Sequence, residues 1–401
     1  MLRANHYLIA EKPLRANVRW NGQALRPALQ RALVKVASWQ ELDAESEALF
    51  QGFGPSGRRS YVCVLKEPIE TPTGQHSAIK LKAVGKTDPV DPQFPSTQRY
   101  DIDPHSVVIG EDGAISVEAL NIQPLFGRTA ERVSAENRFM QLANERKLPA
   151  PYALGEGEYS DLNFDLQILG FSIMAIKDLE TDNRRLGNIF QVNYSDPGGH
   201  LQRLASTFFP GRPAQESLEY LFYAAGRVQR QYNDNGLITN DCHAGNFALT
   251  SDAQAVLNDF ASGKDKAWLS APQIATYQLL DLNRFIYSVF ILKGWSVGES
   301  LLSGAYPVSA YLEGYFGQEV FSRHKGVETP ERLLRAPKTG PGKNNFMASV
   351  AIKKYSWTRL YDPLQEVLAE EGNEYPLSEQ ERIARHVEMY RSFFRSQGSR
   401  E

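Results

Sequence analysis

Only two cysteines, Cys63 and Cys242, occur among the 401 residues. Two cysteines cannot build a disulfide framework, so we expect a protein of a reducing, cytoplasmic compartment. The longest apolar runs, such as residues 285–292, are far too short to span a bilayer, and the first residues lead into no apolar segment of the secretory type. A secreted effector would share these features because its export signal need not be apolar, and this alternative stays open.

The chain also lacks a strong excess of either charge. Its 44 basic and 47 acidic residues give a net charge of −3, which offers no reason to expect a nucleic-acid or membrane-surface partner. No internal repeat or long low-complexity tract is visible. Apolar residues make up 42% and charged residues 23% of the chain, which is typical of a globular protein with a real core, and the length allows two or three domains.

The first half of the chain is β-rich with one clear helix. A helical pattern over residues 31–50 predicts an N-terminal extension, and residues 61–65 and 77–84 predict two antiparallel strands. Downstream patterns predict a hairpin of 107–109 with 114–117, a helix over 129–147, and strands near 152–154 and 166–176.

The second half is mostly helical. Residues 217–233 have the clearest helical spacing, residues 247–249 and 255–257 predict a small hairpin, and residues 268–394 look helical. We therefore expect an α+β, two-lobed protein. Its predicted parts are an extension (1–48), a β-rich lobe with a Pro-rich insertion at 86–128 (49–177), and a helical lobe (178–401).

Three polar residues follow the helix at 217–233 with a spacing that suggests chemistry. Asp241 is followed five residues later by Asn246, and Asp259 stands eighteen residues after Asp241. One carboxylate can take or orient the proton of an acceptor, while the amide and the other carboxylate can hold Mg²⁺ on phosphates. The spacing therefore favours phosphoryl transfer from ATP, although a single loop aspartate is more often a turn or cap residue.

The segment Asp241-x-His243-x-Gly245-Asn246, followed by Asp259-Phe260-Ala261, resembles the catalytic and metal-binding loops of the protein-kinase-like superfamily. It is most similar to the aminoglycoside and choline kinase branch. The resemblance implies a two-lobed kinase fold with its catalytic loop at 237–263 and with ATP and Mg²⁺ as cofactors. It also implies that Asp241 is the catalytic base, Asn246 a metal ligand and Asp259 the main metal ligand.

Upstream glycines fit the same hypothesis. Gly52, Gly54 and Gly57 have the G-x-G-x-x-G spacing of a loop that covers phosphates, because glycine lets the backbone approach them closely. Pro55 is a departure, since it removes an N–H group and stiffens the loop. A Gly/Pro-rich turn between a helix and a strand is the structural alternative.

Ala78-Ile79-Lys80 resembles the kinase strand that carries the phosphate-binding lysine. We favour Lys80, and Lys82 is the rival because it lies on the same face of the strand two residues later. Glu136, in the predicted helix, is the candidate partner of Lys80, and Glu131 is an alternative. The 56 residues between Lys80 and Glu136 require the insertion at 86–128 to loop out.

Two further positions follow from the resemblance. Met174 and Ile176 fall where the hinge between lobes would bind the adenine edge, and a buried strand is the alternative. Asp281 resembles the helix aspartate that braces the catalytic loop, and His243 is expected to orient that loop by hydrogen bonding rather than to ligate a metal.

Departures from the kinase pattern limit the functional class. Thr239-Asn240 stands where a regulated protein kinase has His-Arg, and no Ala-Pro-Glu segment follows Asp259. We therefore expect an ATP- and Mg²⁺-dependent kinase with a hydroxyl acceptor, with a small molecule favoured over protein Ser/Thr. The alternatives are an atypical or effector protein kinase, a kinase-fold nucleotidyltransferase and a non-catalytic kinase-fold protein.

Overall fold

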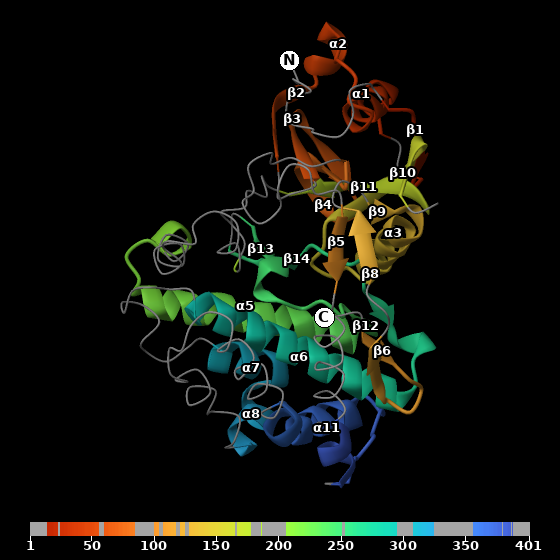
Figure 1. Ribbon diagram of the computed structural model, residues 1–401. Coiled ribbons are helices and arrows are strands. Elements are labelled where there is room, and N and C mark those ends of the chain that lie inside the picture. The colour runs from red at the N-terminus through yellow and green to blue at the C-terminus, as the bar shows by residue number, and fades with distance from the viewer. Residues whose placement is uncertain are drawn as a thin grey trace. The chain divides into compact units, whose positions relative to one another are not determined.

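The computed structural model describes residues 14–22, 25–55, 60–84, 100–103, 107–117, 121–124, 128–164, 167–177, 186, 206–250, 253–294, 308–324, 356–378, 380–385 and 387. The chain divides into two compact units (Figure 1). The first comprises Met1–Asp103 and Asn121–Asp182, and the second comprises Pro104–Leu120 and Asn183–Glu401.

A seven-stranded sheet forms the first unit, and every neighbouring pair of its strands is antiparallel. Six strands follow the order β1-β10-β11-β4-β3-β2, and β9 pairs with β11. The strands are β1 (Ala16–Trp20), β2 (Phe50–Pro55), β3 (Ser60–Thr71), β4 (Gly74–Lys82), β9 (Arg128–Thr129), β10 (Tyr152–Phe164) and β11 (Gln167–Ile176). The predicted strand pair at 61–65 and 77–84 is confirmed as β3 and β4.

One face of this sheet packs against α1 (Pro27–Ala37). Leu29, Leu33 and Val36 of α1 share a buried core with Ile79 and Leu81 of β4. The helix expected over 31–50 ends earlier, because Trp39 adopts a left-handed backbone (φ 58°), and a short α2 (Ala44–Glu47) follows. β1 and α1, which the sequence assigned to an extension, are thus built into the sheet and its core.

The opposite face of β4 carries Lys80 and Lys82, because side chains alternate along a strand. α3 (Ala130–Glu145) contributes Glu136 to this face through an ion pair with Lys82. The helix predicted over 129–147 is confirmed as α3. In the first unit, β5 (Tyr100–Asp103) also pairs with β8 (Asn121–Pro124).

The predicted hairpin of the insertion is confirmed as β6 (Val107–Ile109) and β7 (Ile115–Val117), and it belongs to the second unit. It lies on α6 (Ala271–Gly294), where the Gln273 amide donates to the Ile109 carbonyl at 3.0 Å and the Thr276 hydroxyl donates to the Gly113 carbonyl at 3.2 Å. Gly113 has a φ of 77°, and a Cβ there would meet the Pro272 carbonyl at 2.9 Å.

Helices dominate the rest of the second unit, and α5, α6 and α7 lie side by side (Figure 1). Phe285 of α6 packs edge-on against Phe222 of α5 and stacks on Tyr311 of α7. The helices are α5 (Ala214–Asp234), α7 (Val308–Phe316), α8 (Gln318–Arg323) and α11 (Tyr361–Glu370), with single turns η4 (Ala244–Asn246), η5 (Lys266–Trp268) and η6 (Ser356–Leu360). The predicted helix at 217–233 is confirmed as α5, and the protein is α+β as expected.

Candidate functional site

Two small sheets in the second unit frame the loop that carries Asp241. β12 (Leu237–Ile238) enters the loop and pairs with β15 (Lys264–Asp265). β13 (Phe247–Leu249) leaves the loop through η4 and pairs with β14 (Ala255–Leu257), as predicted. Both ends of the loop are therefore anchored by paired, largely buried backbone.

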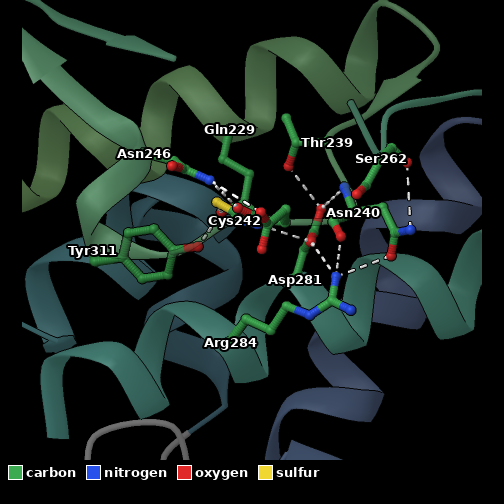
Figure 2. Close-up of polar contacts among 10 residues, drawn as sticks. Gln229, Thr239, Asn240, Cys242, Asn246, Ser262, Asp281, Arg284 and Tyr311 are labelled. Carbon is green, nitrogen blue, oxygen red and sulfur yellow. Dashed lines mark hydrogen bonds and ion pairs between the residues drawn. The ribbon is translucent and has the colours of Figure 1, made fainter. Parts of the chain in front are cut away.

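Asp281 of α6 holds the middle of this loop (Figure 2). Its carboxylate accepts three hydrogen bonds, from the Thr239 hydroxyl (2.9 Å), the Asn240 N–H (2.9 Å) and the Cys242 N–H (3.1 Å). Asp281 is buried, and this burial raises the pKa of its carboxyl, while the nearby Arg284 and the three donors act in the opposite direction. The role expected for Asp281, bracing of the loop, matches this geometry.

Arg284, one turn further along α6, completes the bracing. Its guanidinium donates to the Asn240 carbonyl and to the Asn240 side-chain oxygen, and it lies 3.7 Å from Asp281. Asn240 adopts a left-handed backbone (φ 52°), a conformation that asparagine tolerates better than most residues. The sharp turn before Asp241 is thus fixed by the buried Asp281 together with the partly exposed Arg284.

Asp241 and Asn246 are brought together at the end of the loop. The Asn246 amide group donates to the Asp241 carbonyl at 2.8 Å and lies 3.4 Å from the Asp241 carboxylate. Because a carbonyl can only accept, this contact fixes which end of the Asn246 amide is nitrogen. The Asn246 Oδ1 atom therefore remains as the end of the amide that can bind a cation.

Asp259 reaches the same neighbourhood through the β13–β14 hairpin. The N–H group of Asn258 donates to the Asn246 carbonyl at 3.2 Å, and Asp259 is the next residue. Asp259 is half-buried, so it combines access to solvent with a fixed backbone. An amide oxygen and a carboxylate are hard ligands that suit Mg²⁺, which keeps water and phosphate oxygens in its shell.

His243 forms a hydrogen bond within the loop. Its Nδ1 atom accepts the Gly245 N–H at 3.1 Å and so caps η4. The Ser288 hydroxyl of α6 accepts the Ala244 N–H at 2.9 Å. Within the described residues, no three His, Cys, Asp or Glu side chains gather as a metal site. The role of Asn246 and Asp259 as magnesium ligands stays a prediction.

In the first unit, Glu136 is buried and accepts hydrogen bonds from three side chains. Lys82 donates to one carboxylate oxygen, while Arg128 (3.2 Å) and Ser172 (3.1 Å) donate to the other. Lys82, the rival weighed in the sequence, forms an ion pair with Glu136. The phosphate-binding role of Lys80 stays a prediction. Lys80 is also buried, on the same face of β4, and Glu131 is exposed at the start of α3.

Four of the remaining predicted nucleotide-binding residues lie in the sheet. Gly52 and Gly54 are in β2, where an added Cβ would meet nothing within 4 Å, and Gly57 lies outside the described residues. Met174 pairs with Lys80 on one side and Ala153 on the other, so its backbone belongs to the ladder. Ile176 is the last residue of β11. The adenine-binding role of Met174 and Ile176 stays a prediction.

Several residues of these clusters were missed from the sequence. Arg128 and Ser172 donate hydrogen bonds to Glu136, as Lys82 does. The Gln229 side-chain oxygen accepts the Cys242 thiol and also the Tyr311 hydroxyl (Figure 2). Arg128 lies in β9, two residues before α3 begins, and this nearness to the predicted helix was a usable signal. Gln229 and Tyr311 looked like ordinary helical positions, because their contact joins residues 82 apart.

Comparisons with known proteins leave the family of this chain open. No protein-family model matches the sequence, and a search of curated proteins finds no significant match. None of the helices in the described part of the chain has a stretch long and apolar enough to cross a membrane.

Proposed function

We propose that the protein is an ATP- and Mg²⁺-dependent phosphotransferase whose acceptor is a hydroxyl group. The observation that carries this proposal is the braced loop in which Asp281 fixes the residues on either side of Asp241. Phosphoryl transfer depends mostly on positioning and charge stabilisation, so it needs a carboxylate on a braced loop beside an amide that can bind magnesium.

Each unit carries part of the proposed chemistry. In the second unit, Asn246 and Asp259 would hold Mg²⁺, which neutralises charge on the phosphate oxygens when it is bound. In the first unit, Lys82 is held by Glu136 and lies on the same strand face as Lys80. Both ammonium groups are candidates for binding the phosphates.

Asp241 would act on the acceptor. Its carboxylate accepts or aligns the proton of the acceptor hydroxyl, whose oxygen forms a bond to the γ-phosphorus of ATP. The bond between that phosphorus and the bridging oxygen breaks, and ADP leaves with the electron pair. The Asn246 amide keeps the Asp241 backbone in place through the 2.8 Å hydrogen bond.

A small-molecule acceptor is favoured over a protein. The position before Asp241 is Asn240, whose side chain contacts Arg284 and the Ser262 carbonyl. A regulated kinase would have at this position an arginine that reads a phosphorylated loop, so regulation of that kind is not expected here. An atypical or effector protein kinase remains the second acceptor class.

The test is transfer of label from γ-labelled ATP in the presence of Mg²⁺ and cell extract. We expect a labelled small molecule with the wild-type protein and none with Asp241→Ala, while the surface variant Asp161→Ala keeps full activity. Label on a protein band would indicate a protein kinase. A product heavier by AMP would indicate nucleotidyl transfer, and no product together with no response to MgATP in thermal unfolding would indicate a non-catalytic protein.

A further inference from the structure

A buried polar contact links α5 and α7 directly to the candidate catalytic loop. The Gln229 side-chain oxygen on α5 accepts a hydrogen bond from the Cys242 thiol at 2.8 Å, and the same oxygen accepts the Tyr311 hydroxyl of α7 (Figure 2). All three residues are buried. Burial also raises the pKa of the Cys242 thiol well above its ordinary value, so the thiol stays protonated and can donate.

The position of Tyr311 is fixed by packing on two sides. Its ring stacks on Phe285 of α6, with centroids 3.6 Å apart and an angle of 9° between the planes. Its backbone lies against Gly226 of α5, where a Cβ would come within 2.0 Å of the Tyr311 carbonyl. The glycine therefore allows the backbones of α5 and α7 to pack in direct contact. This packing restricts the Tyr311 side chain to a position in which its hydroxyl donates to Gln229.

Asp241 is consequently flanked by two independent anchors. Asp281 of α6 fixes the backbone N–H groups of Asn240 and Cys242, while Gln229 fixes the side chain of Cys242. A side chain between two fixed neighbours loses much of its freedom to sample unproductive orientations. In phosphoryl transfer, the alignment of the base is a large part of catalysis.

We propose that Gln229 and Tyr311 are positioning residues for Asp241, acting through Cys242. This inference rests on the proposed phosphotransferase function and extends it from the loop to two helices beneath it. Neither residue touches the reacting atoms. Their effect is on turnover, through the orientation of Asp241, rather than on the affinity for nucleotide.

The same helix pair supplies a matched control. One turn further along both helices, the Asn233 amide of α5 donates to the Tyr315 hydroxyl of α7 at 2.7 Å. Tyr315 is as fully buried as Tyr311, and its hydrogen bond joins α5 and α7 without involving a residue of the Asp241 loop. Tyr315→Phe and Tyr311→Phe therefore remove the same atom from the same helix, but only Tyr311→Phe removes a hydrogen bond to Gln229, the partner of Cys242.

The first readout does not depend on activity. The chain has two cysteines, and both are buried, with Cys63 in the first unit and Cys242 in the loop. We would measure the rate at which a thiol reagent modifies each cysteine in the native protein. Tyr311→Phe and Gln229→Met are expected to raise the Cys242 rate roughly fivefold, the effect of losing one net hydrogen bond, and to leave Cys63 unchanged.

The second readout is label transfer from MgATP. Tyr311→Phe and Gln229→Met should lower kcat by a similar factor, roughly fivefold, with nucleotide affinity unchanged, while Tyr315→Phe keeps the wild-type kcat. Unchanged Cys242 modification, unchanged kcat, or an equal loss of kcat in Tyr315→Phe would each overturn the proposal. If the wild-type protein transfers no phosphate, the proposed function fails, and the thiol rates still report whether Tyr311 and Gln229 hold the loop.

Discussion

The buried carboxylate of Asp281 accepts the N–H group of Cys242 at 3.1 Å, across 39 residues of sequence. Its second oxygen accepts from Thr239 and Asn240, so both oxygens serve donors. This single side chain ties α6 to the residues before and after Asp241.

Asp281→Asn should therefore destabilise the second unit. The new NH₂ group would face a donor, and at least one buried N–H or hydroxyl would lose its acceptor, at a cost of about 1–3 kcal/mol. Urea unfolding measures the loss. As a control, Asp362→Asn removes an exposed carboxylate that pairs with Arg382 at 2.8 Å, and it should cost less than about 1 kcal/mol. Equal effects of the two substitutions would refute the bracing role.

Glu136→Leu should destabilise the first unit strongly. The substitution leaves the buried cations Lys82 and Arg128 without their carboxylate, and breaking a buried pair in this way costs about 3–5 kcal/mol. Glu131→Leu changes an exposed glutamate on the same helix and should have an effect below about 1 kcal/mol. The measurement is the unfolding free energy, and comparable losses for both variants would contradict the observed ion pairs.

A double-mutant cycle can determine whether Lys82 or Lys80 interacts more strongly with Glu136. Because the Lys82 ammonium contacts Glu136, we expect Lys82→Met and Glu136→Gln to be coupled by about 0.5–3 kcal/mol in unfolding free energy. The matched pair Lys80→Met with Glu136→Gln should show the smaller coupling. A larger coupling for Lys80 would restore the assignment that the sequence favoured.

The lowered pKa of His76 predicts that the folded protein loses stability on acidification. Burial, assisted by the positive charge of Lys177, lowers its pKa from 6.5 to about 4, while its ring accepts or donates hydrogen bonds with Thr71 and Thr73. Between these two pH values, His76 is therefore protonated in the unfolded chain and neutral in the folded protein. The unfolding free energy should fall as the pH drops from about 6.5 to about 4. Denaturation of His76→Gln at several pH values should show a smaller fall, and an unchanged pH dependence would sink this assignment.

A comparison of alanine substitutions at Gly113 and Gly211 distinguishes the cost of steric crowding from the cost of backbone strain. Both have positive φ values (77° and 85°), but an added Cβ meets the Pro272 carbonyl at 2.9 Å at Gly113 and nothing within 4 Å at Gly211. Gly211→Ala should cost about 1 kcal/mol, the usual penalty of a left-handed alanine. Gly113→Ala should cost more, because the β6–β7 hairpin must shift on α6. Equal losses in thermal unfolding would mean that the hairpin is not held there.

Local patterns in the sequence predicted the elements that carry the candidate site. The helical spacing of α5 and α3 and the turn between β13 and β14 are encoded by neighbouring residues. Contacts between residues far apart in the chain could not be predicted from these local patterns. Lys80 and Lys82 share one strand face, so only the packing of α3 selects the partner of Glu136. Likewise, the burial of α1 against Ile79 and Leu81 depends on the assembled sheet.

The most direct test of the account compares two carboxylates in one experiment. Single-turnover transfer of γ-labelled phosphate and calorimetric binding of MgATP would be measured for the wild type, Asp241→Asn and Asp259→Asn. We predict that Asp241→Asn binds MgATP like the wild type and loses transfer by at least about 100-fold, whereas Asp259→Asn loses MgATP binding itself. Full transfer by Asp241→Asn, or undiminished binding by Asp259→Asn, would contradict the roles proposed for the loop.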